Sequence, residues 1–252
     1  MLTSQHHIGE VTVKDTVKIM GIDFLNTNKK ALLEEIITRT EQGKKSFIVT
    51  ANPEIVMLAR ENKAYRTAIQ KSNYMIADGT GVVLASKLQK EPLEERIPGF
   101  EVMTDLIDYA AGHQLSCYFL GASKDVNDRM IDKLKELHPE LRIAGHHHGF
   151  FDLDDQEIVA DVIQSKADFV FVALGVPRQE FWITKYLSLF DKGTFIGIGG
   201  SFDIIAGEVK RAPDIWIKLN LEWLYRLIKQ PFRWKRMLKV FEFILRIMSK
   251  RY

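Results

Sequence analysis

The chain has 252 residues, 46% hydrophobic and 27% charged, which is typical of an ordinary globular protein. No apolar stretch reaches 18 residues, so no membrane-spanning helix is expected, and Cys117 is the single cysteine, so no internal disulfide can form. Residues 1–16 lack the apolar core of a signal peptide, and we therefore expect a cytosolic chain. The net charge is +2, but it is unevenly distributed: residues 210–252 contain 12 basic and 3 acidic residues, and the rest of the chain carries a charge of −7. The basic C-terminal segment predicts contact with phosphates, an anionic membrane or nucleic acid.

Apolar runs of strand length alternate along the chain with helical patterns. The expected strands cover residues 17–22, 46–51, 74–77, 116–121, 142–145, 168–174 and 194–199. Helical periodicity lies between them, for example over 29–42, 127–140 and 178–190. This alternation predicts an α/β, Rossmann-like fold with a mostly parallel sheet flanked by helices.

The alternation stops near residue 210. Residues 210–252 have the pattern of two helices interrupted at Pro231, and they are rich in Trp, Phe, Arg and Lys. We therefore expect two parts: an α/β body over 1–209 and a C-terminal helical basic appendage over 210–252, packed on the body or closing over it.

Four expected strands end in small or polar residues. Ligands of open α/β sheets bind beyond the carboxyl ends of the strands, so these positions are expected to meet: Thr50, Asn52, Asp78, Gly79, Gly81, Gln179, Gly199 and Gly200. Asp78 is followed by Gly-Thr-Gly, and these glycines favour a ligand that approaches the backbone beside the carboxylate. Such a carboxylate could act as a general base on a hydroxyl. The alternative is that Asp78 caps a helix or forms a turn. Asn52 before Pro53 is typical of a helix N-cap, which is compatible with a ligand contact.

Several other motifs suggest ligands but have simpler interpretations. Gly-Ile-Gly-Gly lacks the dinucleotide spacing, which disfavours NAD, although it could cradle the phosphates of another nucleotide. Adjacent strand residues point to opposite faces, so histidines 146–148 are expected to have a structural or substrate-contact role and not to share a metal. Asp-Leu-Asp at 152–154 has the form of a sugar-transferase metal motif, but it is expected to cap the following helix. Arg96 before a Pro-Gly turn has, by itself, the pattern of a surface arginine.

Seven motifs in order resemble those of the WecG/TagA family of bacterial glycosyltransferases: TANPEI, ADGTGVV, RIPG, HHG, GVPRQE, GGSFD and KRAP with LEWLYR. They span residues 17 to about 236, and within the family the resemblance is to enzymes of wall teichoic acid synthesis. It implies inverting transfer of N-acetylmannosamine from UDP-N-acetylmannosamine to the 4-hydroxyl of N-acetylglucosaminyl-diphospho-undecaprenol, in β-1,4 linkage. It also implies no metal or other cofactor, and a cytoplasmic protein peripherally associated with the inner face of the plasma membrane.

The resemblance also assigns residue roles. The proposed base falls on Asp78, and the substrate contacts of the family fall on Thr50, Asn52, Arg96 and Gln179. The C-terminal segment of the family is thought to touch the membrane and to bring arginines to the donor diphosphate; by spacing these are Arg226, Arg233 and Arg236. Arg178 stands where relatives commonly have Lys, which keeps the charge.

Two other classes of function are left open by the residues themselves. A non-catalytic module that binds a nucleotide sugar or a lipid diphosphate would use the same contacts without turnover. The tryptophans of the basic segment could stack nucleic-acid bases, but the accompanying Leu, Ile and Phe favour packing or an interface, so no nucleic-acid partner is expected.

The end of the chain has the pattern of an interfacial helix. If residues 232–248 form a helix, most of their apolar side chains lie on one arc, with Phe243 outside the arc and Arg233 within it. A homo-oligomer is compatible with the sequence.

Overall fold

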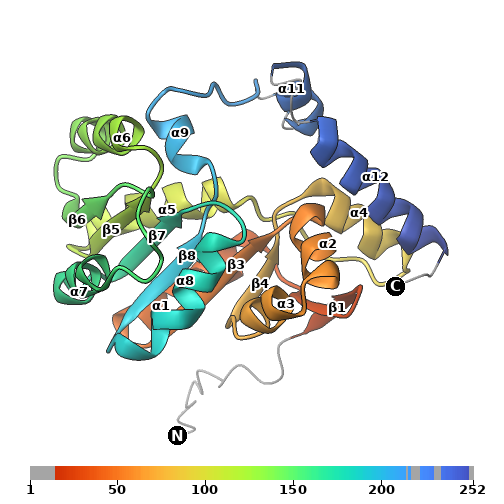
Figure 1. Cartoon of the computed structure of the whole chain (residues 1–252), viewed down its shortest axis with the longest axis horizontal. Coiled ribbons are helices and arrows are strands. Elements are labelled where there is room, and N and C mark those ends of the chain that lie inside the picture. Colours follow the sequence, from red (N-terminus) through yellow and green to blue (C-terminus); the bar gives the residue numbers. More distant parts are fainter. Residues whose placement is uncertain (1–14, 214, 217–221, 230–233, 250–252) are drawn as a thin grey trace, which may run out of the picture.

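The computed structural model describes residues 15–213, 215–216, 222–229 and 234–249, and a six-stranded parallel sheet runs through its centre (Figure 1). The strand order is β4-β3-β8-β7-β5-β6, and every neighbouring pair is parallel. The strands are β3 Lys45–Ala51, β4 Tyr74–Ala77, β5 Ser116–Gly121, β6 Arg142–His147, β7 Phe169–Ala173 and β8 Gly193–Gly197. The predicted α/β, Rossmann-like fold is confirmed, and five of these strands are almost wholly buried because helices cover both faces.

A two-stranded antiparallel hairpin precedes this sheet, where the sequence predicts one strand over 17–22. β1 Thr16–Ile19 pairs with β2 Ile22–Leu25, and Met20 and Gly21 form the connection. Both turn residues have positive φ, 48° and 77°, as a two-residue hairpin turn of type I′ requires. The single-strand prediction is wrong because Met20 gives no turn signal: its side chain is apolar and is buried, with 6% exposed.

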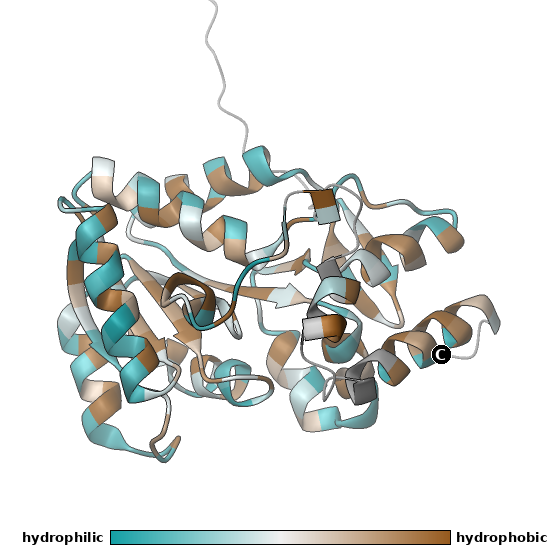
Figure 2. Ribbon diagram, turned by 90° about the horizontal axis from the view of Figure 1, so that it is seen from above, coloured by the Kyte–Doolittle hydropathy of each residue, from teal (hydrophilic) through white to brown (hydrophobic). Residues whose placement is uncertain are grey.

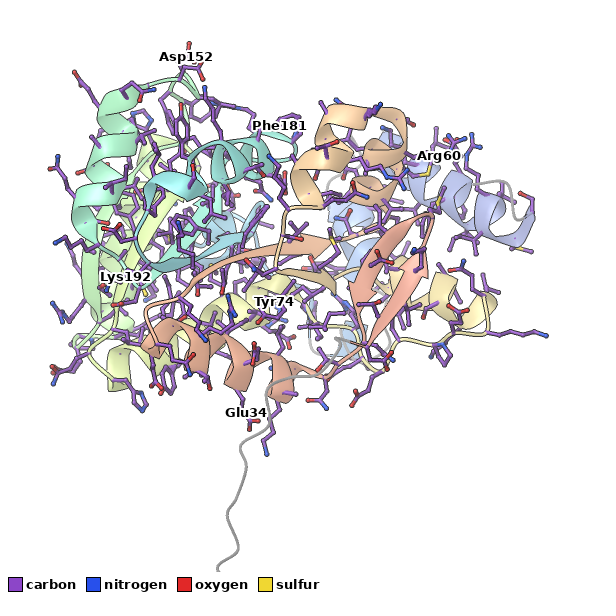
Figure 3. The ribbon with its side chains drawn as sticks, turned by 90° about the horizontal axis from the view of Figure 1, so that it is seen from below. Glu34, Arg60, Tyr74, Asp152, Phe181 and Lys192 are labelled. Carbon is purple, nitrogen blue, oxygen red and sulfur yellow. The ribbon has the colours of Figure 1, made fainter. Side chains whose placement is uncertain are left out.

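Helices form a layer on each face of the sheet. One layer contains α1 Lys29–Glu41, α5 Gly99–Gly112, α6 Lys124–Leu137 and α9 Ser201–Ile205. The other contains α2 Pro53–Glu61, α3 Lys63–Ile69, α4 Thr80–Leu88, α7 Gln156–Ser165 and α8 Arg178–Tyr186, which continues into the 3-10 turn Leu187–Leu189. Figure 2 shows apolar segments in the strands between helices that are largely polar outside. Accordingly, the labelled Glu34 and Asp152 lie at the surface in Figure 3, whereas Tyr74 is buried in the sheet.

Two helices are described in the C-terminal segment, α11 Glu222–Lys229 and α12 Trp234–Ser249. Pro231, the expected interruption, lies outside the described residues. α12 packs across α2 and α4 (Figure 1), with Phe243 and Ile247 in the hydrophobic core. Phe243 is therefore not an exception to a single apolar arc, because α12 has a separate buried face. Among the described residues, no helix combines the length and apolarity needed to span a bilayer. The division of the chain at residue 210 stays a prediction.

Candidate active site

Four adjacent strands place the predicted residues at one edge of the sheet. β4, β3, β8 and β7 are neighbours and parallel, so their carboxyl ends lie side by side. Thr50 lies in β3, Asp78 follows β4, Gly199 follows β8, and Gln179 lies in the first turn of α8 after β7. The strand-end rule thus places these residues on a common edge, and hydrogen bonds connect several of them.

Asp78 is held by backbone groups from two other segments. Its amide donates to Ala51 O over 3.0 Å, and its Oδ1 accepts a hydrogen bond of 3.2 Å from the Gly99 amide, at the first residue of α5. The carboxylate therefore satisfies an N–H group at a helix N-terminus, where a negative charge is favoured. α4, the helix that directly follows Asp78, has Gly79 as its N-cap and no side-chain cap. Asp78 thus does not cap the helix that follows it, and its carboxylate instead accepts from the first amide of α5, whose N-cap is Pro98.

The glycines after Asp78 make room for protein atoms. A Cβ on Gly79 would lie 2.9 Å from Pro53 Cδ, and one on Gly81 would lie 2.6 Å from Pro53 Cγ. Both distances are shorter than real Cβ contacts, so the start of α4 can pack against the start of α2 only without side chains at these positions. The sequence attributes these glycines to an approaching ligand; the structure shows a packing role for them, and a ligand contact at Gly79 stays a prediction.

Arg96 and Thr50 both make contacts within the edge. Arg96 is half-buried, and its Nε donates to Asp78 O over 2.7 Å, so the interpretation as a simple surface arginine is wrong. Thr50 Oγ1 donates to Gly197 O over 2.8 Å and thereby joins β3 to the end of β8. Thr50 also packs against Gly99, where a Cβ would lie 2.8 Å from the threonine methyl. Contacts thus connect the Asp78 loop through Gly99 and Thr50 to β8.

Asn52 acts as the predicted helix cap. Its Oδ1 accepts from the Ile55 amide over 3.1 Å, and Pro53 occupies the first turn of α2. Gly200 is exposed and is the N-cap of α9. Both positions lie at the same edge as Asp78, and a substrate contact at either stays a prediction.

Gln179 is buried beneath the turn that follows β8. Only 2% of the residue is exposed; its Oε1 accepts from the Gly199 amide over 3.2 Å and its Nε2 donates to Glu180 Oε1 over 2.7 Å. Its amide also lies against Gly197, where a Cβ would be 2.7 Å from Nε2. Gln179 therefore positions the Gly199 turn, a role that the sequence does not reveal.

Glu180 is a residue that sequence reasoning missed. It is 1% exposed, and this burial raises the pKa of its carboxyl to about 7. Its Oε2 has no hydrogen-bond partner among the described residues, and neither has the hydroxyl of Tyr65, whose pKa is raised by burial and by Glu180. In sequence, a glutamate in the first turn of a helix is ordinarily interpreted as a solvent-exposed residue that interacts favourably with the helix dipole, so its burial was not expected. The signal available in the sequence was its position next to Gln179.

The side chains of the three predicted arginines of the C-terminal segment lie outside the described part of the structure. Arg226 lies on α11 and Arg236 on α12, whereas the whole of Arg233 is outside the described residues. Arg178, by contrast, donates from Nη2 to Phe151 O over 2.8 Å and ties α8 to the loop after β6.

Each of the adjacent histidines has a ring nitrogen in a local hydrogen bond. His146 Nδ1 pairs with Asn127 Oδ1 over 2.7 Å, His147 Nδ1 with His148 O over 2.8 Å, and His148 Nδ1 accepts from the Phe150 amide over 3.3 Å. Among the described residues, no group of three or more His, Cys, Asp or Glu side chains has the arrangement of a metal site. A structural role for these histidines is supported.

The predicted cap at 152–154 is one residue out of place. Asp155, and neither Asp152 nor Asp154, is the N-cap of α7, accepting from the Glu157 and Ile158 amides. Asp152 Oδ1 accepts from the Asp154 amide over 2.9 Å, and Asp154 pairs with Lys185. Aspartates at 152, 154 and 155 give the same local signal, so the sequence could not distinguish the cap from the turn before it.

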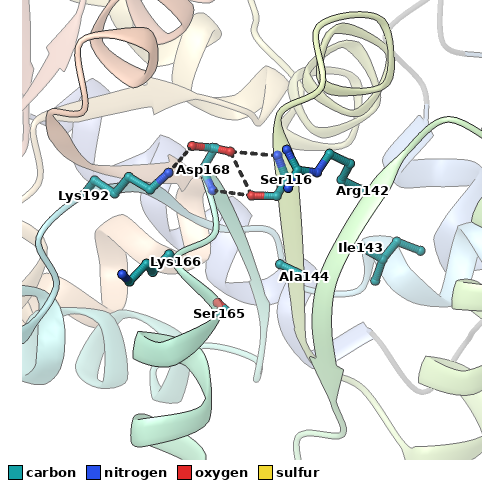
Figure 4. Close-up of a pocket in the computed structure, with 8 residues that line it drawn as sticks. All are labelled: Ser116, Arg142, Ile143, Ala144, Ser165, Lys166, Asp168 and Lys192. Atoms are coloured by element: carbon teal, nitrogen blue, oxygen red, sulfur yellow. Dashed lines mark hydrogen bonds and ion pairs between the residues drawn. The ribbon is translucent and has the colours of Figure 1, made fainter.

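Two cavities are lined by residues away from the Asp78 edge. One, of about 360 Å³, lies at the amino ends of β5, β6 and β7, where Asp168 pairs with Lys192 over 2.6 Å and accepts from Ser116 (Figure 4). The other, of about 700 Å³, lies between the start of β3 and α8. We place the candidate site at the carboxyl edge because the polar side chains and helix N-termini converge there.

Comparison with known proteins identifies relatives over nearly the whole chain. Residues 17–252 match the family model described as the glycosyl transferase WecG/TagA/CpsF family. A Bacillus spizizenii protein is 41% identical over 236 residues, covering 93% of this chain and 91% of the relative. A Staphylococcus aureus protein (strain MRSA252) is 41% identical over 222 residues, covering 87% and 86%. Both are named N-acetylglucosaminyldiphosphoundecaprenol N-acetyl-beta-D-mannosaminyltransferase.

Proposed function

Because the chain belongs to the WecG/TagA/CpsF family of glycosyl transferases, we propose that it transfers N-acetylmannosamine to N-acetylglucosaminyl-diphospho-undecaprenol. The observation that carries this proposal is the 41% identity, over 93% of this chain, to a relative whose name states that transfer. In the finer form of the proposal, the donor is UDP-N-acetylmannosamine, and the acceptor 4-hydroxyl forms a β-1,4 linkage with inversion.

Asp78 is the proposed general base. Its carboxylate would take the proton of the acceptor 4-hydroxyl while that oxygen forms a bond to C1 of the donor sugar. The bond from C1 to the diphosphate oxygen breaks, and UDP leaves with the electron pair. Two observations support this role: Asp78 lies at the meeting of neighbouring strand ends, and its Oδ1 is oriented by the Gly99 amide at 3.2 Å.

The remaining predicted residues would bind and position the substrates. We assign substrate contacts to Asn52, Arg96 and the Gly199–Gly200 turn, with Thr50 and Gln179 holding that turn through their hydrogen bonds to β8 and its loop. Charge on the departing diphosphate would be stabilised by arginines of the C-terminal segment, proposed as Arg226, Arg233 and Arg236. The same segment would bring the protein to the membrane surface that presents the lipid acceptor.

The test uses the purified full chain, UDP-N-acetylmannosamine and a short-chain lipid acceptor, with UDP release and disaccharide as readouts. Asp78→Asn retains an oxygen that can accept from the Gly99 amide, so the fold should be kept while kcat falls by a factor on the order of 10² to 10⁴. Asp78→Ala also leaves that amide without its partner and should in addition lower the free energy of unfolding by about 1–3 kcal/mol. Near-normal turnover of Asp78→Asn would remove Asp78 from the base role, and donor binding by the wild type without turnover would favour a binding module.

A further inference from the structure

The buried carboxyl of Glu180 has no role in the transfer proposed above. It lies in the first turn of α8, next to Gln179, and 1% of the residue is exposed. Burying a carboxyl is costly even when it is protonated, and an apolar side chain of similar size would fill the same space without that cost. A residue that departs from the rules of core packing in this way is expected at a functional site or beside one.

Two side chains from different elements adjoin this carboxyl. Glu180 Oε1 accepts from Gln179 Nε2 over 2.7 Å. The other neighbour is Tyr65 of α3, which packs against α8 with 5.8 Å between its ring centroid and that of Phe181, labelled on α8 in Figure 3. Burial and the nearby Glu180 carboxyl raise the pKa of the Tyr65 hydroxyl. The carboxyl therefore lies between the packing of α3 on α8 and the side chain of Gln179.

The hydrogen bond to Glu180 determines which way round the Gln179 amide lies. A primary amide has one acceptor oxygen and one donor nitrogen, and half a turn about its last torsion exchanges them. In the observed orientation Oε1 accepts from the Gly199 amide over 3.2 Å and Nε2 donates to Glu180. Since a backbone N–H can only donate, the reversed orientation would place two donors against each other at Gly199. Glu180 stabilises the orientation that satisfies Gly199.

The Gln179 amide in turn holds the segment that follows β8. It lies against Gly197, where a Cβ would be 2.7 Å from Nε2 and 3.1 Å from Cδ, so a side chain on β8 would occupy its place. Gly199 itself has a φ of 53°, and glycine has no strong intrinsic preference that would keep it there. The shape of the Gly199–Gly200 turn therefore depends on the contact with Gln179.

We propose that Glu180 is a positioning residue for sugar transfer: by accepting from Gln179 Nε2 it keeps Gln179 Oε1 on the Gly199 amide, and it thereby holds the Gly199–Gly200 turn in the shape that contacts the substrates. The inference rests on the proposed function, in which that turn is a substrate contact. Glu180 itself would touch neither substrate. A carboxyl or carboxamide oxygen can fill this role, whereas an apolar side chain of the same length cannot.

The first test compares two replacements of similar length, with sugar transfer to the short-chain acceptor as the readout. Glu180→Met keeps the unbranched shape but offers Gln179 Nε2 no oxygen, so kcat should fall by about tenfold or more. Glu180→Gln retains an acceptor oxygen and should keep turnover within a few-fold of wild type. The matched control is Tyr65→Phe, which removes a buried hydroxyl from the same region and leaves the contact with Gln179 intact; its kcat should stay within about twofold. Urea unfolding checks that all three variants fold.

A double variant tests whether Glu180 acts through Gln179. In Gln179→Met the Gly199 amide has already lost its acceptor, so the addition of Glu180→Met should lower kcat by less than about twofold. Two reductions that multiply would overturn the proposal. Near-normal turnover of Glu180→Met would do the same, and so would equal losses in Glu180→Met and Tyr65→Phe, because the effect would then come from damaged packing.

Hydrogen exchange at the Gly199 amide, measured by NMR, gives a readout that needs no turnover. Its rate should rise by about tenfold or more in Glu180→Met and stay close to wild type in Glu180→Gln and Tyr65→Phe. An unchanged rate in Glu180→Met would contradict the positioning role. If the wild type transfers no sugar but the exchange rates follow this order, the proposed function fails and the role of Glu180 in holding the turn stands.

Discussion

Glu180→Gln tests whether the fold holds a protonated carboxyl beside the site. The burial that leaves 1% of Glu180 exposed raises the pKa of its carboxyl from the ordinary 4.5 to about 7. Between these values the unfolded chain has lost this proton and the folded chain retains it. Folding therefore becomes less favourable as pH rises from about 4.5 to about 7, and the full loss persists above that.

The magnitude follows from the pKa difference. At about 1.4 kcal/mol per unit, Glu180 should cost about 3 kcal/mol of folding free energy at pH 8, of which about 2.5 kcal/mol is lost between pH 5 and pH 8. The glutamine introduced by Glu180→Gln carries no titrating proton, and its Oε1 could still accept from Gln179 Nε2. The variant should thus exceed wild type by no more than about 1 kcal/mol near pH 5 and by about 3 kcal/mol near pH 8, and it should keep turnover within a few-fold.

The assay is equilibrium urea unfolding of both proteins at the two pH values, and the quantity compared is the difference between variant and wild type. Taking this difference cancels the titration of the other groups. Glu34→Gln, an exposed site on α1, controls for the loss of one negative charge. A difference between Glu180→Gln and wild type that is the same at both pH values would refute the reasoning, because burial would then not be holding the proton.

Two further predictions concern the same edge of the sheet. Gly197→Ala places a Cβ 2.7 Å from Gln179 Nε2, so we expect urea unfolding to show a free energy of unfolding lower by about 1–3 kcal/mol, together with reduced turnover. The control is Gly112→Ala, whose new Cβ has no described atom within 4 Å outside its own helix and chain neighbours and which should change neither quantity. Treatment with EDTA should leave transfer largely intact; a loss that Mn²⁺ or Mg²⁺ restores would direct attention back to Asp152 and Asp154.

The sequence alone predicted the fold class and the edge of the sheet where the polar residues gather. Both depend on local signals: strand-length apolar runs such as 74–77 and 116–121 coincide with β4 and β5 as observed, and a polar residue directly after such a run must lie at the carboxyl end of a parallel strand. The cap at Asn52 was predictable for the same reason, since capping depends on residues three positions apart.

The tertiary structure decided which segments become neighbours. Nothing in the periodicity places β8 between β3 and β7, and that order alone brings Thr50 to Gly197 and Gln179 to Gly199. The packing of α4 on Pro53 and the burial of Glu180 and Phe243 likewise depend on distant residues. A local pattern records whether a side chain prefers water or the interior, but the identity of the atoms it meets there depends on how the whole chain packs.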